Sequence, residues 1–175
     1  METAPARSAP TWYRDRAAWD LIALRYVPLL GLLNLLWESA QLPFYTLWRE
    51  APAPFIAYAV VHCTLGDMVI GTLALVLALI ATRARALETW RWQRIALALV
   101  IPALGYTVLS EWVNTVARAG WEYSDLMPIV RFNGLAIGLS PLLQWLVIPP
   151  LALRLAATRR VRMQQDGVIK EESTR

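Results

Sequence analysis

Residues 60–71, VVHCTLGDMVIG, place an imidazole and a carboxylate inside an otherwise apolar stretch. His62 is the only histidine of the chain, Cys63 is its only cysteine, and Asp67 follows the histidine by five residues. An imidazole titrates near neutral pH, and a carboxylate can hold or accept the proton that it releases. The stretch therefore indicates acid–base chemistry in an apolar setting.

Two further carboxylates lie in similar surroundings, Glu38 in LWESAQLPF and Glu111 in SEWVNT. Isomerases, cyclases and hydratases work with such a general acid and a general base. We expect Glu111 and Asp67 to be this acid and base, with His62 as a proton relay. Five polar residues are expected to bind and orient the substrate: Glu38, Asn34, Asn114, Gln144 and Ser140.

Other chemistry fits these side chains less well. His62 with Glu38, Asp67 and Glu111 would form a carboxylate-rich metal site, but the chain has no HExxH, CxxC or paired-histidine spacing. We therefore predict no bound metal and no cofactor. The plain alternative for His62 is a hydrogen-bonded contact between helices.

The composition indicates a membrane protein. Hydrophobic residues make up 57% of the 175 residues and charged residues 17%, whereas soluble domains are about 45–50% apolar and about a quarter charged. Each apolar block has the roughly 20 residues that a helix needs to cross a bilayer, and none has the alternating pattern of a membrane barrel. The blocks cover residues 21–40, 55–81, 95–117 and 134–157.

These blocks predict an all-α fold, a single domain built as a bundle of four transmembrane helices. The ends, residues 1–10 and 163–175, lack a sustained apolar face and are expected to be flexible. Pro149 and Pro150 are expected to kink the fourth span or to unwind it locally.

Basic residues gather in the N-terminal segment, in the loop between the second and third blocks and in the C-terminal tail, while the other two loops hold only Arg49, Arg118 and Arg131. This distribution predicts that both termini are cytoplasmic. It also explains the net charge of +4 without nucleic acid, because the basic residues flank spans and meet lipid headgroups. We expect a multi-pass protein of the inner (cytoplasmic) membrane, with membrane lipids as its partners.

Each block carries one small or polar stripe at helical spacing. In a membrane bundle such stripes face other helices. The stripes contain Asn34, Glu38 and Gln41, then Gly66, Asp67 and Gly71, then Thr107, Glu111 and Thr115, and finally Ser140 and Gln144.

The cytoplasmic orientation of both ends places Glu38, His62, Asp67 and Glu111 in the non-cytoplasmic leaflet. We therefore predict one polar, carboxylate-rich cavity there, with Arg118 as a counter-ion for Glu111. His62 and Asp67 diverge by about 140° on a helix, so each is expected to face another span rather than the other.

Residues 134–138, GLAIG, match the small-xxx-small packing motif, which predicts a homodimer through Gly134 and Gly138. Two other segments, ESAQLPF and SPLLQWLVIPPL, resemble pieces of the sterol-isomerase-like four-helix membrane family. The members of that family use buried acids. The resemblance implies acid–base chemistry on a lipid-like molecule, although the order of the intervening spans does not match.

Three functions are compatible with these features. The first is an intramembrane acid–base enzyme, similar to an isomerase, cyclase or hydratase, that acts on a lipid or isoprenoid-like substrate. The second is a small proton-coupled transporter that uses the same carboxylates. The third is a non-catalytic accessory subunit, in which the polar stripes only hold helices together or bind a partner.

Overall fold

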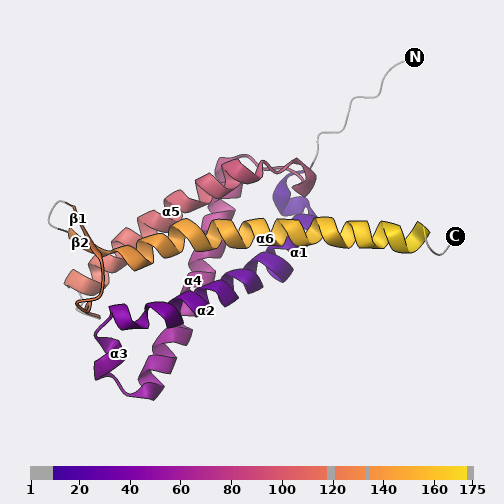
Figure 1. Ribbon diagram of the computed structural model, residues 1–175. Helices are drawn as coiled ribbons and strands as arrows, with labels where there is room; N and C mark the ends of the chain where they lie inside the picture. The colour runs from indigo at the N-terminus through magenta and orange to yellow at the C-terminus, as the bar shows by residue number, and fades with distance from the viewer. Residues whose placement is uncertain (1–9, 118–120, 133–134, 173–175) are drawn as a thin grey trace, which may run out of the picture.

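The computed structural model describes residues 10–117, 121–132 and 135–172 (Figure 1). Within these residues, four helical segments are long and apolar enough to cross a membrane, which confirms the predicted all-α bundle and the multi-pass topology. The helix α1 and the far end of α6 lie at one end of the bundle, and α3 and the strands lie at the other (Figure 1). The four spans are Arg16–Phe44, Ala53–Ala81, Trp92–Thr115 and Leu139–Thr158.

The first span is helical throughout but changes its hydrogen-bond pattern along its length. It consists of α1 (Arg16–Leu21), the π-helical turn η2 (Ile22–Tyr26), α2 (Val27–Gln41) and the 3-10 turn η3 (Leu42–Phe44). Asp15 caps α1, because its side chain accepts a hydrogen bond from the backbone nitrogen of Ala17 at 3.0 Å.

The same carboxylate joins the N-terminal segment to the loop between the second and third spans, since its Oδ2 accepts a hydrogen bond from the backbone nitrogen of Leu87 at 2.7 Å. Asp15→Ala is expected to lower the free energy of unfolding by about 1–3 kcal/mol, because two backbone donors lose a charged acceptor. Thermal unfolding in detergent measures this loss. Asp20→Ala is the matched control, since Asp20 is exposed on the same helix, and an equal loss in both variants would contradict the cap.

The second span begins at prolines and ends just before a residue whose backbone conformation is left-handed. After α3 (Leu47–Glu50), Pro52 and Pro54 open α4 (Ala53–Ala81), where the first backbone nitrogens need no helical partner. At the other end Arg83 takes the left-handed conformation, with φ of 51°. The backbone nitrogen of Ala84 then reaches the carbonyl of Leu79 at 2.9 Å, which closes the helix.

The third span follows the 3-10 turn η4 (Leu87–Thr89) and consists of α5 (Trp92–Trp112) and the π-helical turn η5 (Val113–Ala117). The π-helical turn begins two residues after Glu111. A π-turn inserts an extra residue into a helical turn and is often found at functional sites.

The fourth span begins later than predicted, because residues 135–138 form a strand. Strands β1 (Ile129–Phe132) and β2 (Leu135–Gly138) pair antiparallel, with Ile129 opposite Gly138, and α6 (Leu139–Glu172) follows immediately. The β-branched residues of the two strands favour this pairing.

Gly138 is thus in a strand and Gly134 lies outside the described residues, so the predicted small-residue packing motif is not helical at Gly138. A homodimer therefore stays a prediction, and a helical packing motif at Gly138 no longer supports it. Helix α6 runs through Pro149 and Pro150 without a break, where the sequence predicts a kink or an unwound turn, and continues into the tail that the composition predicts to be flexible (Figure 1).

The four long helices form a closed ring, in which α2 contacts α4 and α6, and α5 contacts the same two helices. The contact between α2 and α4 is close at Gly71, where a Cβ would lie 2.7 Å from Cδ2 of Leu30. The Tyr26 hydroxyl donates a hydrogen bond to the carbonyl of Gly71 at 3.1 Å. Small residues permit such an approach of two helices in a membrane.

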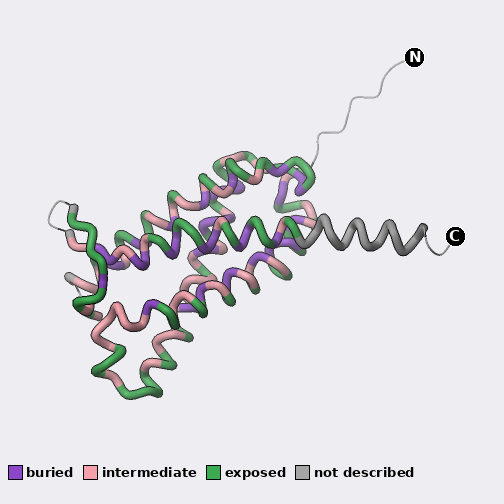
Figure 2. The backbone as a smooth tube through the Cα atoms, viewed as in Figure 1, coloured by how far each residue is buried: buried purple, intermediate pink, exposed green. Residues whose placement is uncertain are grey.

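Buried residues recur along all of the long helices (Figure 2). They are apolar in one half of the bundle and include polar side chains in the other. Apolar side chains such as Ile22, Leu79, Leu99 and Leu153 fill the end near the termini. The buried polar side chains lie toward the other end, and they come from all four spans: Asn34, Gln41, Thr64, Thr107, Glu111, Ser140 and Gln144.

Candidate functional site

A pair of carboxyl groups lies at the centre of the polar half. Glu38 of α2 and Asp67 of α4 are both partly buried, and both accept a hydrogen bond from the same atom, Nε2 of Gln144. Two carboxyl groups held close together repel each other when both are ionised. The shared donor therefore defines a pair of neighbouring carboxyl groups inside the bundle.

Gln144 of α6 is the principal hydrogen-bond donor to this pair. Its Nε2 lies 2.8 Å from Oδ2 of Asp67, 3.0 Å from Oε1 of Glu38 and 2.9 Å from Oδ1 of Asn34. An amide nitrogen carries only two hydrogens, so three acceptors compete for two donors. Gln144 can therefore move its hydrogen bonds from one carboxyl group to the other when the charge of either group changes.

Gln41 and Ser140 extend the network. Gln41 donates from Nε2 to Oε1 of Glu38 at 2.8 Å, and the Ser140 hydroxyl donates to Oε1 of Gln41 at 2.8 Å. Asn34, which is nearly fully buried, donates its own amide hydrogen to the carbonyl of Leu30 at 2.9 Å. The pair is thus surrounded by amide and hydroxyl groups that are themselves held in place.

A third carboxyl group lies close by in α5. Glu111 is 5% exposed, and it accepts a hydrogen bond at Oε2 from the hydroxyl of Tyr123. The same hydroxyl accepts a hydrogen bond from the backbone nitrogen of Gly138 at 3.0 Å. The indole nitrogen of Trp121 also approaches Glu111 without reaching full hydrogen-bond geometry. Glu111 therefore joins α5 to the segment that leads into β2 and α6.

Tyr45, just after the first span, is close enough to four titratable groups for their charges to act on its phenol group, namely Glu111, Tyr123, Glu38 and Cys63. Burial, reinforced by the charge of Glu111, raises the pKa of Tyr45 well above the ordinary value of 10.0. Burial and the hydrogen bond to Glu111 likewise raise the pKa of Tyr123. Both phenols are therefore neutral across the physiological range.

The loops that follow the first and third spans are joined to each other beside this site. The Tyr45 and Tyr123 backbones pair as a β-bridge, and their rings lie 5.8 Å apart. The backbone nitrogen of Thr46 donates to the carbonyl of Glu122 at 3.0 Å, and that of Ser124 donates to the carbonyl of Phe44 at 2.9 Å. These bonds make the loops one cover over the polar half.

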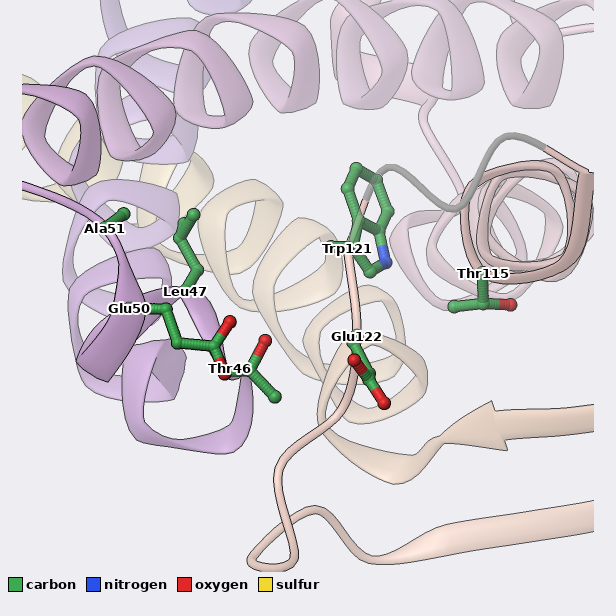
Figure 3. Close-up of a pocket in the computed structure, with 7 residues that line it drawn as sticks. All are labelled: Thr46, Leu47, Glu50, Ala51, Thr115, Trp121 and Glu122. Carbon is green, nitrogen blue, oxygen red and sulfur yellow. The ribbon is translucent and has the colours of Figure 1, made fainter.

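An open hollow of about 470 Å³ adjoins this cover (Figure 3). Its lining includes Thr46 and Glu50 from one loop, Trp121 and Glu122 from the other, and Thr115 at the end of the third span. Thr115 donates a hydrogen bond from its hydroxyl to the backbone carbonyl of Glu111.

The structure brings together most, but not all, of the residues predicted for the site. Asn34, Glu38, Asp67, Ser140 and Gln144 belong to one hydrogen-bonded network, and Glu111 lies within electrostatic range of Glu38. The predicted open cavity is therefore occupied, around the carboxyl pair, by amide and hydroxyl side chains.

His62 does not take part in this network. It is exposed on α4, where its ring stacks on that of Tyr58 at 5.5 Å. His62 lies only five residues before Asp67 on α4, but its side chain points outward from the bundle, because the two residues diverge by about 140° on a helix. A relay role and a metal site that need His62 beside Asp67 are therefore not compatible with this arrangement.

Asn114 is also directed elsewhere, because its amide donates to the carbonyl of Ser110 at 2.8 Å within its own helix. Arg118, the predicted counter-ion of Glu111, lies outside the described residues. In the part of the chain that the structure describes, no group of three or more histidine, cysteine, aspartate or glutamate side chains is placed to hold a metal ion.

Four residues of the site were not among those predicted from the sequence, namely Gln41, Tyr45, Trp121 and Tyr123. Gln41 continues the stripe of Asn34 and Glu38, so helical spacing was enough to find it. The three aromatic residues lie in loops that are rich in aromatic side chains, and such loops are equally typical of a membrane interface.

Comparisons of the chain with family models, curated proteins and solved structures find no match. The resemblance to the sterol-isomerase-like family therefore remains a likeness of two short segments. One of them contains Glu38 and Gln41, and the other contains Ser140 and Gln144.

Proposed function

We propose that this chain is an intramembrane acid–base enzyme that transfers protons to and from a lipid or isoprenoid-like substrate. In this proposal the Glu38–Asp67 pair donates its shared proton to a carbon of a substrate double bond. A carboxylate then removes a proton from a neighbouring carbon, so the double bond moves and the pair regains one proton. Gln144 follows the change in charge by shifting its two hydrogens between three acceptors.

The observation that carries this proposal is that two carboxyl groups inside the bundle share one amide donor, Nε2 of Gln144. Within the described residues, the side chains that donate hydrogen bonds to the pair are the amides of Gln144 and Gln41. An acid at the centre of a span costs about 2.5–3.5 kcal/mol to insert, so acids within spans are usually functional. A cation beside the pair would hold both groups ionised, whereas neutral amides permit a proton to be held and released.

We further propose that the protein resides in the cytoplasmic membrane of a bacterial cell, with both termini in the cytoplasm and the carboxyl pair in the outer leaflet. The clustering of basic residues in the terminal and central cytoplasmic segments supports this orientation. The substrate then reaches the site from the surrounding lipid or from the outer surface. Membrane lipids are the partners that this location implies.

The test is to follow deuterium into lipids. Membrane vesicles that contain the full chain are incubated in deuterated water, their lipids are extracted, and the extracts are washed with ordinary water before mass spectrometry. We expect one lipid class to gain deuterium at carbon, which does not wash out. Vesicles with the double variant Glu38→Gln, Asp67→Asn are the control and should show no such lipid.

Two other results would overturn the enzyme. If no lipid gains deuterium but an imposed pH gradient drives solute flux that the double variant lacks, the carboxyl pair serves transport. If the double variant behaves as wild type in both assays, the pair only holds helices together, as in an accessory subunit.

A further inference from the structure

We propose that Thr64 and Trp37 bind an oxygen atom of the substrate in the seam between α2 and α4, beside the Glu38–Asp67 pair. The substrate is then a lipid or isoprenoid that carries a hydroxyl or carbonyl oxygen near its reacting double bond. This inference rests on the proposed function for the identity of the substrate, but binding of the oxygen can be tested without turnover. Both residues position the substrate, and neither transfers the proton.

Thr64 has a buried hydroxyl group that makes no hydrogen bond. The residue is 7% exposed, and its Oγ1 has no partner in the part of the chain that the structure describes. A helical threonine commonly donates to the carbonyl four residues before it, as Thr72 does at 2.6 Å and Thr107 does at 3.0 Å. The hydroxyl of Thr64 does not bond the carbonyl of Val60 in this way. A buried hydroxyl without a partner lowers stability, so it is best explained as a group that binds a ligand.

Helices α2 and α4 run in opposite directions, and two contacts define their register. At the first, a Cβ at Gly71 would lie 2.7 Å from Cδ2 of Leu30. One turn farther along, Asn34 and Asp67 both accept from Nε2 of Gln144, at 2.9 and 2.8 Å. Residues that share a level therefore move forward by four on α2 as they move back by four on α4.

The same register places Trp37 opposite Thr64. Each lies seven residues from the contact of Leu30 with Gly71, and seven residues return a helix to within about 20° of the same line. Trp37 packs against the apolar core, and its indole nitrogen is buried with no hydrogen-bond partner among the described residues. Two buried groups that lack partners thus lie at one level of the seam, one turn from Asp67.

These two groups select an oxygen acceptor. An indole nitrogen can only donate a hydrogen bond, whereas a hydroxyl can donate or accept one. A carbonyl or hydroxyl oxygen has two lone pairs, so one such atom can accept from both groups. Thr64 lies three residues before Asp67, which places their Cβ atoms about 5–6 Å apart. An oxygen held by Thr64 therefore leaves the neighbouring carbon atoms of the substrate beside the carboxyl pair.

Met68 gives the seam a side chain that can move to admit a substrate. It is half-buried one turn after Thr64, and its Sδ lies 2.8 Å from the position of a Cβ at Gly31. The glycine thus provides the space that the thioether occupies. Methionine is unbranched and flexible, so its rotation opens the seam beside Thr64.

The test is a binding measurement that needs no turnover. The purified full chain in lipid nanodiscs is equilibrated with radiolabelled farnesol, farnesal or farnesene, which share an isoprenoid chain and carry a hydroxyl, a carbonyl or no oxygen. We expect wild type to bind one of the oxygenated probes about tenfold more tightly than the hydrocarbon, since two hydrogen bonds form. Thr64→Val and Trp37→Phe should each reduce this preference about fivefold. Thr64→Ser should retain it.

Thr72→Val is the matched control on α4, because the hydroxyl of Thr72 is already bonded to the carbonyl of Met68. It should keep the preference for oxygen. Thermal unfolding gives a second measurement, in which Thr64→Val should not lower the unfolding midpoint, since the hydroxyl makes no hydrogen bond. A lower midpoint would show that the hydroxyl is bonded within the protein and would overturn the site.

The outcomes separate this inference from the proposed function. An equal preference in wild type and Thr64→Val, or no preference in wild type, would overturn the oxygen site alone. An undiminished preference in Trp37→Phe would overturn the role of Trp37. A preference that depends on Thr64, together with no deuterium in any lipid, would overturn the enzyme and leave the oxygen site intact. If Trp37→Phe does not fold, the valine and serine variants of Thr64 still decide.

Discussion

Gln144→Leu is expected to lower the free energy of unfolding by about 3 kcal/mol, the largest stability loss of any single substitution in the network. The leucine retains most of the volume but removes the only side chain that donates to both members of the carboxyl pair. Hydrogen bonds between membrane helices contribute about 0.6 kcal/mol each on average. Two such bonds account for roughly 1 kcal/mol, and the Asp67 carboxyl group, which is left without its amide donor, adds about 2 kcal/mol.

Thermal unfolding of the purified chain, or steric trapping in bicelles, measures this loss. Leu146→Ala is the control on the same helix, because Leu146 is 46% exposed and faces away from the network. Gln144→Glu separates the loss of the donor from the loss of polarity, since it keeps the shape but presents a third carboxyl to the pair. A Gln144→Leu protein as stable as wild type would show that the network does not hold the bundle together.

Asp67→Asn and Glu38→Gln are each expected to reduce lipid deuteration by about 10²- to 10⁴-fold, the usual contribution of a general acid or base. The two losses should be similar, because the proton is shared and either amide leaves nothing that can release it. Stability should change little by comparison, since an amide keeps one acceptor and supplies its own donor. The pair of variants thus separates proton transfer from packing.

The measurement is the initial rate of deuterium uptake in vesicles with equal amounts of folded protein. Glu50→Gln is the matched control, because Glu50 lines the outer hollow and is exposed. Its rate should stay within a few-fold of wild type. Full activity in either Asp67→Asn or Glu38→Gln would contradict the role of the pair, whatever the stability of the protein.

The long apolar blocks were sufficient to predict the bundle, since hydropathy over about 20 residues is a strong signal. The start of the fourth span was not predictable in the same way. Residues 135–138, LAIG, are as apolar as the helix that follows, and hydropathy alone does not distinguish a short apolar strand from the first turn of a helix. The pairing with β1 makes residues 135–138 a strand.

Helical spacing also predicted which side chains of α2 and α6 meet, because residues three or four apart share a face. Asn34 and Glu38 satisfy that rule, as do Ser140 and Gln144. His62 was grouped with them by depth alone, and depth does not determine direction. With about 140° between His62 and Asp67, a helix that turns Asp67 inward directs His62 toward the lipid.

The loop residues of the site could not be predicted from the sequence, for a different reason. Tyr45 and Tyr123 meet because two outer loops pair through their backbones, and neither loop has a periodic pattern that predicts this pairing. Their aromatic residues fit an interface position equally well. The contact between them depends on tertiary structure that only the assembled bundle provides.

The network has a consequence for how the protein is made. Gln144 lies 106 residues after Glu38 and 77 residues after Asp67, and spans enter the membrane in the order of their synthesis. Both acids therefore enter the bilayer before Gln144, which donates hydrogen bonds to them, has left the ribosome. During that interval the insertion machinery, water or a proton must satisfy them. Insertion of α6 is thus the step that converts an intermediate of three spans into the complete bundle.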